Sequence, residues 1–130
     1  MPLGLYLVKF DVGDAGKPGA PILHVQAAVD APTGHITGQG EITQAIAPPA
    51  GELPIKNLSG QLRSLGFGPA HRVVTLTGEC IYYFPPPEIG QTAYPFSATL
   101  VIGENDWAGH GSFSYGPHHI ENVPVTPVED

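Results

Sequence analysis

Basic residues, cysteine and long apolar runs are what this chain has least of. Its 130 residues include five Lys and Arg against twelve Asp and Glu, a formal net charge of −7. Nucleic acid binding needs a cationic face that displaces counterions from phosphates, and an anionic membrane surface attracts the same kind of face. Because the five basic residues are scattered, we expect neither partner. No run approaches the roughly 20 apolar residues of a transmembrane helix.

The single cysteine, Cys80, excludes an internal disulfide, which fits a reducing compartment. The first ten residues lack the basic start and apolar stretch of a signal peptide. We therefore expect a cytoplasmic protein, with export by a route without a signal peptide left open. Cys80 itself is expected on the apolar face of a strand, where a thiol behaves as a small inert hydrophobe rather than a nucleophile.

Charged residues are also few, at 13% of the chain, whereas 17 glycines and 15 prolines make up nearly a quarter of it. Apolar runs alternate with the Gly and Pro clusters, a pattern typical of turns between many short strands. The length suits one domain. We predict a single β domain over residues 1–116, followed by an acidic, Pro-containing tail over 117–130 with a short edge strand possible at 119–123.

The most regular stretch is Trp107–Tyr115, which alternates strictly. One side of this predicted strand carries Trp107, Gly109, Gly111, Phe113 and Tyr115, and the other carries Ala108, His110, Ser112 and Ser114. The same order of large apolar residue, small residue, glycine and polar residue recurs at 36–42, 58–62 and 76–82. The glycines fall on the apolar faces. They indicate either strands that coil at barrel corners or bare backbone that receives a ring from the opposite wall.

Alternation predicts seven or eight strands and no helix. The predicted ranges are 4–12, 22–30, 35–46, 58–65, 71–84, 93–102 and 107–115, with 119–123 as the eighth. Three prolines within 47–57 predict a surface connection there. Because sequential strands with short connections pair antiparallel, the fold class is all-β, mostly a meander. A compact barrel and a β-sandwich both remain open.

Two sets of side chains are candidate sites. A barrel with inward-facing glycines could leave a cavity between rings, so a ligand-binding site would use Trp107, Tyr82 and Phe113 with His110. A metal site would use His110, His118 and His119, with Glu121 or Asp106 as further ligands. These residues match no zinc signature, and solvent-facing histidines or core aromatic rings are the commoner roles. We expect no cofactor.

The residues Pro21-Ile-Leu-His-Val-Gln26 and Asp30-Ala-Pro-Thr-Gly-His-Ile-Thr-Gly-Gln-Gly-Glu-Ile-Thr-Gln-Ala45 resemble the bacterial family known as domain of unknown function 1842. Residues 106–115, Asp-Trp-Ala-Gly-His-Gly-Ser-Phe-Ser-Tyr, are similar to the closing strand of that family. The resemblance covers roughly residues 4–116. It implies a bacterial origin and an all-β domain that stands alone, and it brings no activity and no catalytic residue.

For function, the sequence favours a non-enzymatic binding or interaction module. The Pro-rich segments 47–54 and 85–87 would be stiff loops on a rigid scaffold, where recognition usually resides. The partner would be a protein or a small apolar ligand, and self-association through an edge strand is a further option. Two alternatives stay open: a metal-binding protein, and a small enzyme in which one of the histidines at 110, 118 and 119 meets Glu41, Glu79 or Asp106.

Overall fold

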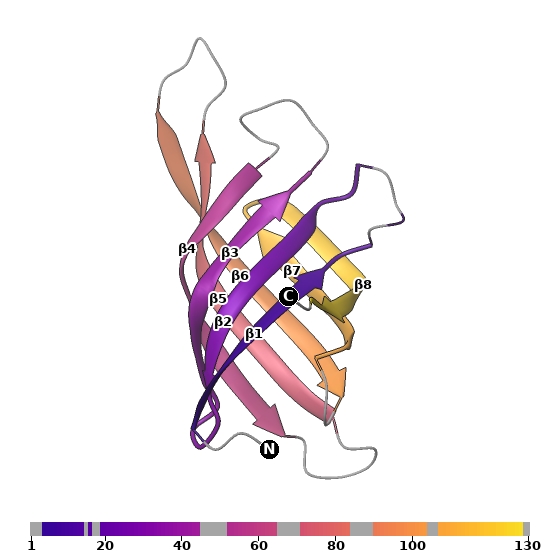
Figure 1. The fold of residues 1–130 in the computed structure, drawn as a ribbon. Helices are drawn as coiled ribbons and strands as arrows, with labels where there is room; N and C mark the ends of the chain where they lie inside the picture. The colour runs from indigo at the N-terminus through magenta and orange to yellow at the C-terminus, as the bar shows by residue number, and fades with distance from the viewer. Residues whose placement is uncertain are drawn as a thin grey trace.

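The computed structural model describes residues 4–14, 16, 19–44, 52–64, 71–83, 90–103 and 107–128, which form one antiparallel sheet closed into a barrel (Figure 1). Each strand pairs with the next in sequence, and β8 pairs with β1. The strands are β1 Leu5–Val12, β2 Ile22–Asp30, β3 His35–Thr43, β4 Glu52–Ser64, β5 His71–Tyr83, β6 Gln91–Gly103, β7 Gly109–Tyr115 and β8 His118–Pro127. The all-β antiparallel prediction is confirmed, and the barrel is the correct one of its two forms.

The meander gives the barrel two ends with different sets of connections. The connections β1–β2, β3–β4, β5–β6 and β7–β8 lie at the upper end in Figure 1, and β2–β3, β4–β5 and β6–β7 lie at the lower end. Of the Pro-rich segments that the sequence singled out, 47–54 and 85–87, only residues 52–54 are described, and they belong to β4. Residues 45–51 and 84–89 lie outside the described residues.

The start of β4 corrects the sequence analysis. Three prolines in 47–57 predicted a connection with a strand only from about 58, but β4 begins at Glu52. At Pro54 the strand pairs with Glu41 of β3, while its register with β5 begins only at Ile55. A strand tolerates a proline where one of its two edges carries no ladder. A bulge at Asn57, which has a φ of 57°, then restores the inward direction of the apolar side chains.

Strand β8 is also longer than the sequence suggested. A short edge strand was predicted at 119–123, whereas β8 covers His118–Pro127 and pairs with β7 along most of its length. Its last residues also pair with β1, at Phe10–Pro127, Asp11–Thr126 and Val12–Val125. Residues beyond position 116 therefore close the barrel.

The interior is an apolar core, and none of the described residues is a buried polar or charged side chain. Side chains of alternate residues point inward from every strand, as the period of two requires. The largest fully buried ones are Phe10, Phe96, Leu23, Ile36, Ile42, Leu76, Leu100, Ile102, Val12, Val25, Val29 and Val74. Packing of this kind fills the barrel with side chains rather than leaving it as an open channel.

The strand glycines lie where neighbouring strands come very close together. A Cβ atom on Gly60 would collide with the carbonyl oxygen of Thr75, and one on Gly109 with that of Val101. These obstacles are backbone atoms of the adjacent strand, not rings of the opposite wall. The first interpretation of the repeated glycines is therefore confirmed at these positions: they permit the tight coiling of a small barrel.

Candidate functional site

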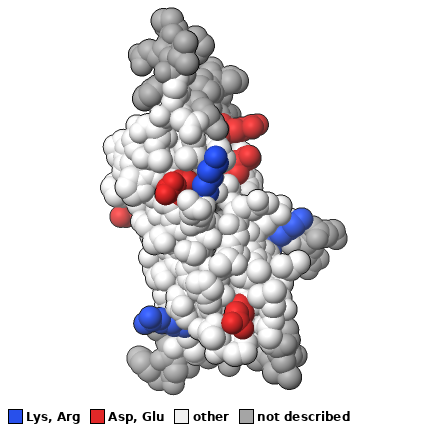
Figure 2. Space-filling view, turned by 90° about the vertical axis from the view of Figure 1, so that its left-hand side faces the viewer, with Lys and Arg blue, Asp and Glu red and all other residues white. Residues whose placement is uncertain are grey.

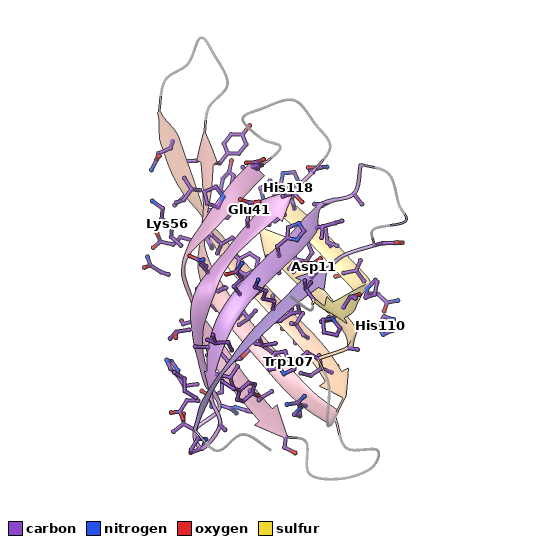
Figure 3. All side chains as sticks on the ribbon, in the orientation of Figure 1. Asp11, Glu41, Lys56, Trp107, His110 and His118 are labelled. Carbon is purple, nitrogen blue, oxygen red and sulfur yellow. The ribbon has the colours of Figure 1, made fainter. Side chains whose placement is uncertain are left out.

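The four side chains predicted to line a ligand cavity do not meet in one place. Trp107 precedes β7 and lies at the lower end of the barrel (Figure 3), whereas Tyr82 is the next-to-last residue of β5, a strand that ends at the upper end (Figure 1). Phe113 is buried in the core from β7. His110 is exposed and projects from the outer face of the same strand.

Trp107 is 8% exposed and acts as a plug at the lower end. Its ring stacks on Phe10 of β1, with centroids 5.3 Å apart. The guanidinium carbon of Arg72 lies 5.5 Å from the centre of the Trp107 ring, a cation–π arrangement. Arg72 also donates a hydrogen bond from Nε to the carbonyl oxygen of Gly103 at 2.8 Å. The tryptophan therefore links β1 to the segments around β5 and β6.

Aromatic rings also gather at the upper end. Tyr82 lies against Tyr94 with ring centroids 5.8 Å apart, and Tyr115 stacks on Phe113 at 6.2 Å. Gly116 packs against the face of Tyr94, where a Cβ atom would come within 2.8 Å of the ring. Both Tyr82 and Tyr94 are half-buried and pack against the core. The geometry describes a packed aromatic end of the barrel.

The three predicted metal ligands point in different directions. His118 stacks on Tyr115 with centroids 4.9 Å apart, and His119 projects from the outer face of β8 opposite Ser114. His110 lies farther along β7, opposite Pro124. Among the described residues no three His, Cys, Asp or Glu side chains are grouped to hold a metal ion. Asp106, the other ligand considered, lies outside the described residues.

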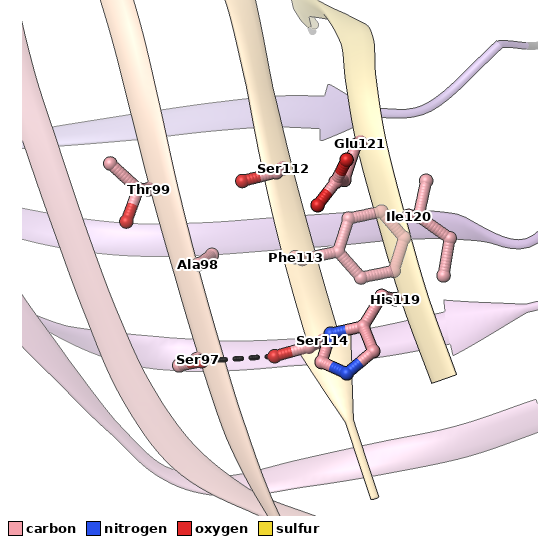
Figure 4. Close-up of a pocket in the computed structure, with 9 residues that line it drawn as sticks. All are labelled: Ser97, Ala98, Thr99, Ser112, Phe113, Ser114, His119, Ile120 and Glu121. Atoms are coloured by element: carbon pink, nitrogen blue, oxygen red, sulfur yellow. Dashed lines mark hydrogen bonds between the residues drawn. The ribbon is translucent and has the colours of Figure 1, made fainter. Parts of the chain in front are cut away.

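His119 does share a shallow hollow with Glu121, as the sequence allowed. The hollow has a volume of about 80 Å³ and lies on the outer face of β6, β7 and β8 (Figure 4). Hydroxyl groups line most of it, and the hydroxyls of Ser97 and Ser114 lie 3.1 Å apart. This volume holds only a few water molecules.

The sequence analysis missed a polar cluster across β1, β2 and β3. His24 Nδ1 lies 2.8 Å from Asp11 Oδ1, and His24 Nε2 lies 2.8 Å from Thr43 Oγ1. The order carboxylate, imidazole, hydroxyl resembles a nucleophilic relay. However, Glu41 is the cross-strand partner of His24, and Glu52 that of Thr43. These carboxylates would destabilise a developing oxyanion. The cluster is therefore better suited to linking three strands than to catalysis.

No signal in the sequence could have revealed this cluster directly. Asp11, His24 and Thr43 are 13 and 19 residues apart along the chain. They meet because the register places Asp11 opposite His24 and His24 opposite Glu41, next to Thr43. A hairpin prediction with its register specified would have been needed.

The two carboxylates considered for acid–base chemistry, Glu41 and Glu79, lie on β3 and β5 with β4 between them. Glu79 is opposite Lys56 of β4, and both side chains are exposed on the outer face. Figure 2 shows a few charged side chains separated by broad uncharged surface on the side of the barrel that it presents. Glu41 and Glu79 therefore lie on the outer surface of the barrel and do not face each other across a cleft.

Cys80 is fully buried in the interior. Burial raises the pKa of its thiol from the ordinary value of 9.0 to about 11. A thiol with a raised pKa is protonated at neutral pH and is a poor nucleophile. The structural role expected from the sequence agrees with this environment.

The most exposed apolar side chains of the described residues lie on β1. Leu5 is 71% exposed and Leu7 is 82% exposed, both on the outer face. A hollow of about 330 Å³ lies beside Leu7, floored by the small residues Ala27, Ala28 and Gly38 of β2 and β3. We call Leu5, Leu7 and this hollow the β1 surface.

The backbone of the same strand is paired on one side only over most of its length. On the β2 side, β1 pairs from Leu5 to Val12. On the β8 side, residues 10–12 of β1 are the ones that have described strand partners. One further hydrogen bond of 3.0 Å runs from Val128 N–H to Lys9 O. Within the described part of the chain, no strand pairs with Leu5–Val8 on that side.

The chain matches the family model for Domain of unknown function (DUF1842) over residues 3–119, and it belongs to that family. The resemblance found in the sequence is thereby confirmed. No curated protein matches the chain. Within the described residues, no helix is long and apolar enough to cross a membrane.

Proposed function

We propose that the protein is a non-enzymatic interaction module that binds an extended segment of a protein partner at the β1 surface. The observation that carries this proposal is the exposure of Leu5 and Leu7, at 71% and 82%, on a strand edge that no described strand covers. Unpaired edges with apolar side chains are templates for a further strand. Main-chain hydrogen bonds to such an edge provide affinity, and alternate side chains provide specificity.

The edge lacks the features that usually protect one. Leu5, Tyr6, Leu7 and Val8 include no charge and no proline, whereas natural edge strands are commonly blunted by lysine, proline or a bulge. The hollow of about 330 Å³ lies on the β2 side of Leu7, across β1 from the open edge, and continues the outer surface beside Leu7 over β2 and β3. A packed apolar interior supports a site on the outer wall in preference to one inside the barrel.

The experiment is hydrogen exchange of the β1 amides in the presence of a synthetic peptide that alternates valine and threonine. Binding by strand addition slows exchange of the Leu5 and Leu7 amides, which face the same edge as Lys9 O, and leaves the β5 amides unchanged. The variant Leu7→Lys should lose this protection. The matched control is Val101→Lys, because Val101 is another exposed apolar residue, on β6, at 42%. Unchanged exchange at β1 in dilute, monomeric protein with saturating peptide would reject the proposal.

A further inference from the structure

We infer that the strand received by the β1 surface is β1 of a second copy, so that two barrels join through one continuous sheet. This inference rests on the proposed function and names its partner. The free edge, which is the part of β1 that no described strand covers on the β8 side, is short: Val128 already bonds to Lys9 O, and Gly4, with a φ of +101°, leaves the strand conformation. The segment between these limits has Leu5, Tyr6 and Leu7 at its centre.

The pattern of faces makes this segment complementary to itself. Residues directly opposite each other in an antiparallel pair project from the same face of the sheet. Pairing about a twofold axis at Tyr6 places Leu5 opposite Leu7 of the second copy, and Leu7 opposite its Leu5. The two Tyr6 side chains meet on the inner face. Four leucines, the exposed Leu5 and Leu7 of each copy, then cover one another, an isologous contact of the kind that closes as a dimer.

Other registers are less suitable. A shift by one residue places outward leucines opposite inward side chains, which the pleat does not allow. Centring on Leu7 places Leu5 opposite Lys9, and the β1 edge at Lys9 is already bonded to Val128. Only the register centred on Tyr6 uses the free edge and keeps all four leucines on one face.

Charge also favours a second copy at this edge, although each chain carries a net charge of −7. The paired segment has no charged side chain, so the contact brings no carboxylates together. Lys9 is the next outward residue on β1, and Asp30 is the cross-strand neighbour of Leu5 on β2. In the Tyr6-centred register, Lys9 of each copy projects past Leu5 of the other, toward the side of its Asp30. Opposite charges therefore flank the leucines at both ends.

The test is sedimentation equilibrium combined with disulfide trapping on the full chain. Wild type should approach twice 13.6 kDa as its concentration rises, and Leu7→Lys should remain at 13.6 kDa. Val101→Lys should still dimerise. Tyr6→Cys should form a covalent dimer under mild oxidation, because directly opposite residues have the Cα separation that a disulfide needs. Leu5→Cys should not, since it faces Leu7 of the other copy, and wild type should not, since Cys80 is buried.

The outcomes separate this inference from the proposed function. Wild type that stays at 13.6 kDa up to its solubility limit, with no trapped dimer from Tyr6→Cys, overturns the second copy as the partner. If the same protein still protects its β1 amides with the valine–threonine peptide, the interaction module stands with a different partner. A dimer that persists in Leu7→Lys also overturns the inference, because β1 is then not the interface. Circular dichroism of each variant verifies that the barrel is folded.

Discussion

The wall formed by β5 and β6 and the seam between β1 and β8 are parts of one closed sheet, yet they are held together differently. Strands β5 and β6 pair along their full 13 residues, from His71–Gly103 to Tyr83–Gln91. At the seam, three register pairs of described residues join β1 to β8. The wall relies on an extended ladder, whereas the seam depends on a short one supported by the Trp107 ring on Phe10.

The same difference applies to the leucines of the two regions. Leu100 of β6 is fully buried, while Leu5 and Leu7 of β1 face solvent. A leucine on a continuous wall contributes to folding by being removed from water. A leucine on the outer face of an open edge contributes little to folding and remains available for a partner. The comparison therefore separates residues that stabilise the barrel from residues that can serve binding.

The largest effect is expected at the plug of the seam. Replacing Trp107 with alanine should lower the free energy of unfolding by about 4 kcal/mol, since it removes the ring that packs on Phe10 and beneath Arg72. Urea denaturation followed by circular dichroism measures the loss. Trp107→Phe keeps a ring in the same place and should lose less. A Trp107→Ala protein as stable as wild type would mean that the three seam pairs suffice.

The leucine comparison is sharpened by two matched truncations. Leu100→Ala should cost about 3 kcal/mol because it leaves a cavity in a filled interior. Leu7→Ala should change stability by no more than about 0.5 kcal/mol, as expected for an exposed position. Chemical denaturation of dilute protein measures both without association. Equal losses from the two substitutions would remove the distinction between wall and seam.

A smaller effect is expected from a glycine of β4, the strand that pairs with β5 of the wall. Gly60→Ala should cost about 2 kcal/mol, because the new Cβ would collide with the carbonyl oxygen of Thr75 and force the strands apart. Gly40→Ala is the control, since its Cβ would lie 3.1 Å from the His24 carbonyl oxygen and needs only a slight shift. Thermal unfolding compares the two. A larger loss at Gly40 would contradict the close approach at Gly60.

The smallest effect concerns alkaline pH in the wall. The folded thiol of Cys80 has a pKa of about 11, above the ordinary 9.0, because it is buried. As pH rises past 9 the unfolded chain therefore loses this proton first, so stability is unchanged below pH 9 and falls between about 9 and 11. Cys80→Ala should flatten this decline in part. Burial, with the nearby Cys80 charge, also raises the pKa of Tyr115, so part of the fall in stability at alkaline pH should remain in the variant. Identical pH profiles for the variant and wild type would contradict the assignment.

Much of the fold was predictable because strand alternation is a local property. The predicted range 22–30 is the observed β2, and the glycine-bearing phrases fall on β3, β4, β5 and β7. In two regions the predicted strands, beginning at about 58 and covering 119–123, are shorter than the observed β4 and β8. Proline content suggested a connection over 47–57 and little structure after 123, but one unpaired edge at Pro54 and the pairing of β8 with β1 place 52–57 in β4 and 124–127 in β8. Such effects depend on which edge of a strand is occupied.

The candidate sites were less predictable for the same reason. The sequence offered the aromatic and histidine residues as candidates for a site, yet Trp107 and Tyr82 lie at opposite ends of the barrel. The cluster of Asp11, His24 and Thr43 exists only through the registers of β1, β2 and β3. The exposure of Leu7 could not be foreseen either, because an alternating strand shows which residues share a face and not whether a neighbour covers its edge.

The sequence by itself determined that the chain forms antiparallel strands, which residues share a face, and where a glycine leaves room for close approach of other atoms to the backbone. These follow from the two-residue period of a strand and from steric limits that act within a few residues. The tertiary structure alone decided that the sheet closes into a barrel, and that closure leaves part of β1 with no described strand beside it on the β8 side. Closure depends on the registers of all eight strands together, and no single segment of the chain contains that information.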